Sequence, residues 1–181
     1  MPGVIRRGLD ALYGAGAAIA ALALLGIFLV MMGQVGLRFL GVQFPGADDI
    51  SAYLCVATTF FALALTFKRG ELIRVGLLLE RLSPGPRRVM EIVALILAAI
   101  GSAYAVWWTA DDVIFSWQIE DLAQGPLPIP LWIPKLAMPV GAGILLIAVL
   151  DELATVLRGE RPSYVIAAEE RAARGNFTAE V

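Results

Sequence analysis

Four apolar segments separated by polar ones dominate the pattern of hydrophobic and polar positions along this chain. The first three run from Ala11 to about Gly36, from Ile50 to Phe67 and from Ile92 to Ala110, and none of them contains a charged residue. About 20 apolar residues in a helix, each adding about 1.5 Å, cross a hydrocarbon core of about 30 Å. The pattern therefore predicts a membrane-spanning helix at each of these three segments.

The fourth apolar segment is shorter and less regular than the others. It runs from Leu136, directly after Lys135, to Leu150. Because proline lacks an amide hydrogen and fixes φ, Pro134 and Pro139 favour a kinked or irregular start. We expect a fourth spanning helix here.

The composition agrees with a membrane protein. Hydrophobic residues make up 59% of the 181 positions and charged residues 17%, whereas soluble domains have about half and about a quarter. Arg6 and Arg7 imitate a signal peptide, but the uncharged run after them is too long for one, so we expect a retained helix. We predict an all-α membrane domain of four spanning helices over residues 1–159. Residues 160–181 are polar, and we expect a flexible tail there.

The positive residues are concentrated on alternate polar segments. Two lie before the first span, six between the second and third spans and four after the fourth, whereas the other two segments carry one each, Arg38 and Lys135. Because cytoplasmic segments of membrane proteins are enriched in Lys and Arg, we predict that both termini and the central segment are cytoplasmic.

The opposite side of the membrane then carries an excess of negative charge. Its acidic residues are Asp48, Asp49, Asp111, Asp112, Glu120 and Asp121. Two interpretations stay open. Acidic residues are merely tolerated on this side, or they form a docking surface for a partner with basic patches, since opposed potentials steer association.

The two longest polar segments predict different local structures. Apolar and charged residues alternate between Ile73 and Leu82, which favours a short amphipathic helix in the headgroup layer between the second and third spans. Residues 83–86 would end it, and an ordinary connector is the alternative. The proline-rich residues 124–130 predict a rigid extended linker.

The sequence offers no catalytic or metal-binding motif. It contains no histidine, and its single cysteine, Cys55, has no second thiol to pair with. These absences exclude histidine-ligated haem or zinc, an internal disulfide and a catalytic pair that uses histidine. No ionisable residue lies near the middle of a span, where ion and proton pathways usually need one. We therefore expect a non-enzymatic helper without a cofactor, and a net charge of −2 gives no indication of a nucleic-acid partner.

At this point the polar segments resemble those of one family, the small membrane subunit (DctQ-like) of tripartite ATP-independent periplasmic (TRAP) transporters. The matching stretches, in the family's order, are Arg38-Phe39, Pro45-Gly46-Ala47-Asp48-Asp49, Lys68-Arg69-Gly70-Glu71-Leu72-Ile73-Arg74-Val75, Leu82-Ser83-Pro84 with Arg87-Arg88, Pro128-Ile129-Pro130-Leu131-Trp132-Ile133-Pro134 and Met138-Pro139-Val140-Gly141. This chain departs from the family at Leu72, where histidine is frequent, and at Gly76, where Asp or Asn is frequent. Any role of that imidazole is therefore absent here.

The resemblance implies a scaffold role in the bacterial inner membrane. In this family a periplasmic binding protein delivers an organic acid to a membrane complex, whose large subunit binds sodium and substrate and performs a sodium-coupled import. The small subunit packs beside the large one and carries neither site. Besides lipid, its expected partners are thus the large membrane subunit and the binding protein.

On this interpretation, residues at the ends of the spans are candidates for contacts with a partner or with lipid. They are Arg38, Asp48 and Asp49 at the outer end, Lys68, Arg69, Glu71 and Arg74 at the inner end, and Trp132 and Pro134 at the start of the fourth span. Ordinary membrane anchoring explains each of them equally well. The alternative function is a membrane anchor of another complex, either a tricarboxylate-type tripartite transporter or a respiratory oxidoreductase.

Overall fold

A computed structural model describes residues 3–70, 84–159, 162 and 164–166, and the regular elements of that part are helices apart from one isolated bridge. The helices are α1 (Gly3–Phe39), α2 (Ala47–Arg69), α4 (Pro84–Gln118), α5 (Trp132–Lys135) and α6 (Ala137–Leu157). Four stretches, Arg6–Phe39, Ala47–Arg69, Arg88–Gln118 and Trp132–Leu157, are long and apolar enough to cross a membrane. The predicted all-α class and the four spans are confirmed.

The helices extend beyond the uncharged segments that predicted them. Helix α4 begins at Pro84, so Pro84, Gly85 and Pro86, which we expected before the third span, belong to the helix of that span. Proline is favoured in the first turn of a helix, where its missing donor has no partner to lose. Helix α4 also continues past Ala110 to Gln118, through two aspartates.

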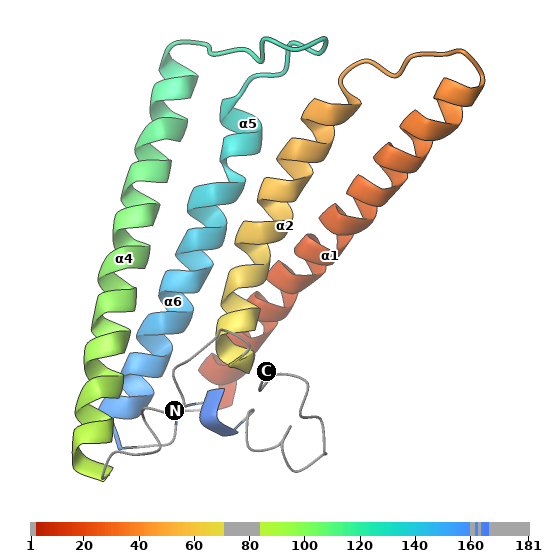
Figure 1. Ribbon diagram of the computed structural model, residues 1–181. Coiled ribbons are helices and arrows are strands. Elements are labelled where there is room, and N and C mark those ends of the chain that lie inside the picture. The colour runs from red at the N-terminus through yellow and green to blue at the C-terminus, as the bar shows by residue number, and fades with distance from the viewer. Residues whose placement is uncertain (1–2, 71–83, 160–161, 163, 167–181) are drawn as a thin grey trace.

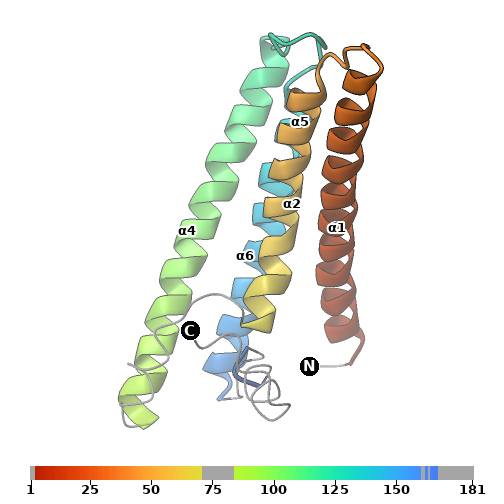
Figure 2. The same ribbon diagram turned by 45° about the vertical axis from the view of Figure 1, so that its right-hand side comes forward.

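The four spans lie in an open row. Helix α1 packs on α2, α2 packs on α6, and α6 packs on α4, whereas α1 and α6 touch only slightly. Figures 1 and 2 show α4 and α1 at the two edges of this row and the start of α1 at the same end as the end of α6. We call this end the terminal end, and the opposite end, where α1 joins α2 and α4 joins α5, the loop end.

The row has its buried core near the terminal end. The core residues are Tyr13, Ala64, Phe67, Leu95, Ile144, Ala148, Val149 and Val156. Much of the remaining apolar surface is uncovered, including Phe28, Leu29 and Leu97. Helices that are apolar on most sides can expose such side chains in an open row because lipid, rather than water, surrounds them.

A glycine permits the central contact of the row. A Cβ placed on Gly141 of α6 would lie 2.6 Å from the carbonyl carbon of Phe60 on α2. Small residues let membrane helices approach closely and gain dispersion contacts. Gly141 therefore fixes how closely α2 and α6 can pack.

The fourth span starts irregularly, as predicted. Helices α5 and α6 are separated at Leu136, between Pro134 and Pro139. The amide of Leu136 still donates to the carbonyl of Trp132 at 3.2 Å, so the break is tight.

The predicted extended linker is wrong. Residues 121–131 form a closed loop, in which the amide of Ala123 donates to Ile129 O at 2.9 Å and that of Leu131 donates to Asp121 O at 2.9 Å. Prolines cannot donate, but the donors here, Ala123 and Leu131, lie on either side of the prolines, so the loop closes in spite of its proline content.

Two predictions fall wholly or partly on residues outside the described part. The amphipathic helix over residues 73–82 lies there, and so do Glu71 and Arg74. Of the tail, the structure describes only 162 and 164–166, where Tyr164 is buried with its ring 6.4 Å from that of Phe67. The domain boundary at residue 160 stays a prediction.

Candidate functional site: charged clusters at the two ends of the row

At the loop end, the closed loop lies on the start of α2. A Cβ on Gly46, whose φ is +80°, would lie 2.5 Å from Leu127 Cδ1, and a Cβ on Gly125 would overlap the Asp49 carboxylate. Asp48 and Asp49 occupy the first turn of α2, where the helix dipole favours negative charge. The two hairpins of the chain, α1–α2 and α4–α6, thus pack closely at this end, where Gly46 lies against Leu127 and Gly125 lies against Asp49.

Two ion pairs and an amide complete the loop end. Lys135 Nζ, at the end of α5, lies 3.0 Å from Asp112 Oδ2 on α4 and 4.0 Å from Asp121 Oδ2 in the loop. Gln34 Nε2 on α1 donates to Asp48 Oδ1 on α2 at 3.4 Å. The single lysine of this end is therefore engaged within the chain.

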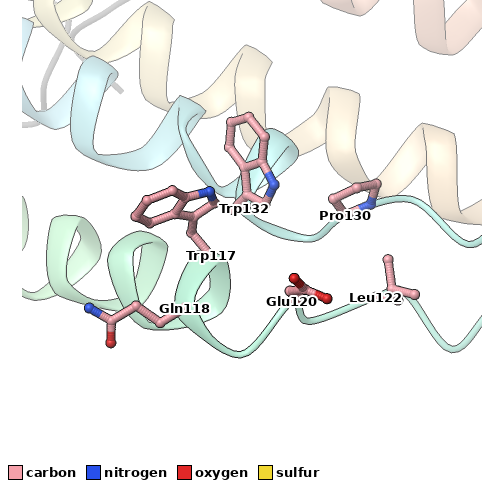
Figure 3. Close-up of a pocket in the computed structure, with 6 residues that line it drawn as sticks. All are labelled: Trp117, Gln118, Glu120, Leu122, Pro130 and Trp132. Atoms are coloured by element: carbon pink, nitrogen blue, oxygen red, sulfur yellow. The ribbon is translucent and has the colours of Figure 1, made fainter.

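Two of the remaining candidates at this end, Arg38 and Trp132, line separate cavities. Arg38 is exposed and lines a cavity of about 560 Å³ together with Gln34, Gln43 and Phe44. Trp132 lines a second cavity of about 470 Å³ with Trp117 and residues of the closed loop (Figure 3). Pro134 is half-buried in α5.

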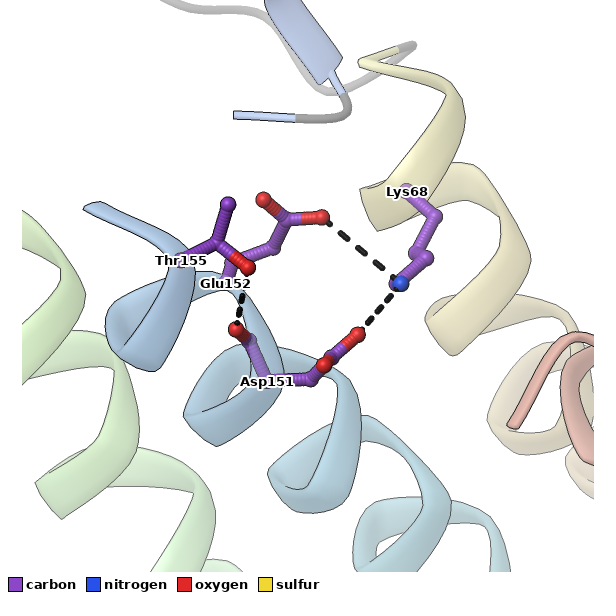
Figure 4. A network of polar contacts seen from close by, with 4 residues as sticks. All are labelled: Lys68, Asp151, Glu152 and Thr155. Carbon is purple, nitrogen blue, oxygen red and sulfur yellow. Dashed lines mark hydrogen bonds and ion pairs between the residues drawn. The ribbon is translucent and has the colours of Figure 1, made fainter. Parts of the chain in front are cut away.

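At the terminal end, Lys68 joins α2 to α6. Its Nζ lies 2.6 Å from Asp151 Oδ2 and 3.7 Å from Glu152 Oε1 (Figure 4). The lysine and aspartate side chains are 12% and 16% exposed, and that of Glu152 is fully buried. Because the pair is largely withdrawn from solvent, its attraction is screened little and removing one partner leaves an uncompensated charge.

The position of this cluster follows from the sequence. Lys68 comes directly after the second apolar segment, and Asp151 and Glu152 come directly after the fourth. Helices α2 and α6 pack on each other and end on the same side of the row, so the charges that end them meet. A cation in the last turn of α2 is also favoured by the helix dipole.

Helix α1 contributes an aromatic ring to the same cluster. The Tyr13 ring centroid lies 4.8 Å from Lys68 Nζ, within the range of a cation–π contact. The tyrosine is buried, and its hydroxyl has no hydrogen-bond partner among the described residues. Lys68 thus contacts groups from α1 and α6 as well as lying on α2.

A second cation at the terminal end joins α4 to α6. Arg88 Nη2 donates to the carbonyls of Val156 at 3.1 Å and Leu157 at 3.3 Å. The last carbonyls of a helix lack intrahelical donors, and an arginine satisfies them and complements the dipole. With Lys68 and Arg88, the four spans are connected at this end.

The structure separates the sequence-predicted residues into the groups that we expected. Arg38, Asp48 and Asp49 lie at the loop end with Trp132 and Pro134, and Lys68 and Arg69 lie at the terminal end. Their contact with a partner or with lipid stays a prediction.

Sequence reasoning missed several residues of the two clusters. Tyr13, Asp151 and Glu152 are the partners of Lys68. Arg88 at the terminal end and Lys135 with Asp112 at the loop end make contacts that do not involve a predicted residue. The available signal was a pair of opposite charges directly after apolar segments that end on the same side. Within the described ranges no group of three or more cysteines or carboxylates is arranged to hold a metal ion.

Comparison with known proteins decides the family. The model of the DctQ component of tripartite ATP-independent periplasmic transporters matches residues 27–159, which include the greater part of the row. This chain belongs to the DctQ family. The resemblance inferred from the sequence is therefore confirmed, and this DctQ chain is a multi-pass protein of the bacterial inner membrane and a TRAP transporter component.

A curated relative adds a second match. The isethionate TRAP transporter permease protein DctMQ of Oleidesulfovibrio alaskensis is 25% identical over 144 residues, which cover 75% of this chain and 22% of that protein. The DctQ chain thus spans about a fifth of that relative's length.

Proposed function

We propose that this DctQ protein is the scaffold subunit of a sodium-coupled secondary transporter. The transporter imports an organic acid that a periplasmic binding protein delivers, and its large membrane subunit holds the substrate and sodium sites. The DctQ subunit packs against the large subunit, needs no cofactor and performs no catalysis.

One observation carries this proposal: the charged groups of the four spans gather at the ends of the row. Among the described residues, those of the spans lie within about two helical turns of an end. At the terminal end, Lys68 and Arg88 tie neighbouring helices together. A path for a charged substrate needs polar groups near the middle of the membrane. The arrangement therefore supports a role in holding a partner rather than in passing a substrate.

The open row supports the presence of a partner. The row carries exposed apolar side chains such as Phe28 on α1 and Leu97 on α4, which suit a second membrane protein as well as lipid. The relative is a single permease protein named DctMQ, and the match to this chain covers 22% of its length. The remaining length of that protein supports our proposal of a large subunit beside the present chain.

We further propose that the terminal end faces the cytoplasm and the loop end faces the periplasm. Lys68, Arg69 and Arg88 lie at the terminal end, and the loop end carries the excess of acidic residues. The enrichment of cytoplasmic ends in cations supports this orientation.

Co-purification tests the proposed function. An affinity tag on this chain, extracted from native membranes in mild detergent, should recover a large TRAP subunit that mass spectrometry identifies. A matched tag on an unrelated four-span protein gives the background. Recovery of this chain alone, or with subunits of a respiratory complex, would refute the scaffold role.

A further inference from the structure

A cavity at the loop end combines two aromatic rings with a carboxylate (Figure 3). It has a volume of about 470 Å³ and is lined by Trp117, Gln118, Glu120, Leu122, Pro130 and Trp132. Figure 3 shows the Trp117 and Trp132 side chains next to each other, while the Gln118 amide extends away from them. Indole faces attract cations, and a carboxylate beside them strengthens that preference.

The backbone at Glu120 is unusual for the residue that occupies it. The amide of Glu120 donates to Trp117 O at 3.3 Å and that of Asp121 donates to Ser116 O at 3.0 Å, which is the Schellman arrangement after a helix. Glu120 has φ +50°, the left-handed conformation that this motif requires and that glycine adopts most easily. A residue kept in an unfavourable conformation at the rim of a cavity indicates a use for its side chain.

The Glu120 carboxylate is available to a ligand. It is exposed, and the described part of the chain gives it no ion pair or side-chain hydrogen bond. Of the two cations at the loop end, Lys135 pairs with Asp112 and Asp121, and Arg38 lines the other cavity, on α1 at the opposite edge of the row. A cation for Glu120 therefore has to come from another molecule.

The charge of the loop end favours a protein over a lipid. Glu120 is exposed, and the acidic residues around it, among them Asp111, Asp112 and Asp121, repel the phosphate that accompanies the amine of a lipid headgroup. A basic protein surface carries no such phosphate, so opposed potentials draw it to this end.

We infer that the cavity formed by Trp117, Glu120 and Trp132 binds a lysine or arginine side chain of the periplasmic binding protein. The inference rests on the proposed function for its partner and its orientation. The acidic excess of the loop end attracts a basic surface, and the cavity then fixes the docking position.

Affinity measurements on the assembled transporter test this inference. The complex of this chain with its large subunit is placed in nanodiscs, and the transporter's own periplasmic binding protein is titrated onto it. Glu120→Gln should weaken binding about tenfold, as expected for loss of a cation–carboxylate contact flanked by aromatic rings. Asp111→Asn removes one charge from the same end but lies outside the cavity, and it should change the affinity less than twofold.

Zero-length carbodiimide coupling gives a direct readout of the contact. It should join Glu120 of the wild-type complex to a lysine of the binding protein, and Asp111→Asn should leave this product unchanged. Equal effects of the two substitutions on affinity, with no product at Glu120, would overturn the inference and leave only long-range attraction.

Varying the lipid composition distinguishes a lipid amine from a protein side chain as the source of the cation. The affinity and its loss in Glu120→Gln should be the same in discs of pure phosphatidylglycerol and in discs containing phosphatidylethanolamine. An effect of Glu120 only with the amine-bearing lipid would assign the cavity to a headgroup and contradict the inference. If no large subunit accompanies the wild-type chain, the proposed function itself has failed; an intact complex without a Glu120 effect refutes the cavity alone.

Discussion

Lys68 of α2 and Asp151 of α6 form an ion pair of 2.6 Å, although 83 positions separate them in the sequence. Glu152 lies on the other side of the ammonium group at 3.7 Å, and the Tyr13 ring lies 4.8 Å from it. This one lysine therefore determines how three helices of the row meet at the terminal end.

Replacing Lys68 should destabilise the row strongly. In Lys68→Met two carboxylates lose their cation at a site that is nearly closed to water, which should lower the free energy of unfolding by about 2–3 kcal/mol. Arg158→Met removes a positive charge from an exposed position at the same end and should change it by less than about 0.5 kcal/mol. Equilibrium unfolding in mixed detergent micelles measures both. Equal stability of the two variants would show that the pair contributes nothing.

The contact between α2 and α6 should tolerate no side chain at Gly141. Because a Cβ there meets the backbone of Phe60 at 2.6 Å, Gly141→Ala should force the helices apart and cost about 1–3 kcal/mol. Gly143, two positions along the same helix, has no atom within 4 Å of its Cβ position. Gly143→Ala should therefore be neutral or slightly stabilising. Thermal unfolding of the two variants provides the comparison, and an opposite order would disprove the close approach.

Stability and docking should conflict at Glu120. Glycine adopts the φ of +50° at this position more easily than glutamate does, so Glu120→Gly should stabilise the chain by about 1 kcal/mol. The same change removes the carboxylate and should weaken docking. Glu120→Ala separates the two effects, since it loses the carboxylate but keeps the strain. A Glu120→Gly variant no more stable than Glu120→Ala would argue against backbone strain at this position.

Thiol labelling should show both ends of the row on opposite sides of the membrane. In a Cys55→Ser background, a cysteine at Gln124 in the closed loop should react with a membrane-impermeant maleimide in intact spheroplasts. A cysteine at Arg158 should react only after the membrane is permeabilised, because cation-rich ends remain cytoplasmic. The reverse pattern would invert the proposed orientation, and labelling of both positions from outside would be incompatible with four spans.

The number and type of the spans could be predicted from sequence because hydropathy is a property of each segment alone. The ends of the helices were harder to predict. Asp111 and Asp112 interrupt the apolar pattern, yet α4 continues through them, since aspartates at the membrane surface remain hydrated while the backbone stays helical. The proline-rich segment predicts an extended linker, whereas the loop is closed by amides of Ala123 and Leu131, which lie outside the run of prolines.

The helix neighbours could not be predicted. No local pattern indicates that α2 packs on α6, so Lys68 was identified as a candidate while its partners Asp151 and Glu152 were missed. The left-handed conformation of Glu120 was hidden for a related reason. Glycine indicates such a position in a sequence, and glutamate does not.

The most direct test of the central claim is reconstituted transport. Proteoliposomes receive the large subunit with or without this DctQ chain, together with the binding protein, the radiolabelled substrate and an inward sodium gradient. We predict sodium-dependent uptake only when all three proteins are present. Apolar substitutions in the charge-free middles of the DctQ spans should leave that uptake unchanged. Full uptake by the large subunit and binding protein without the DctQ chain would contradict the scaffold role proposed for it.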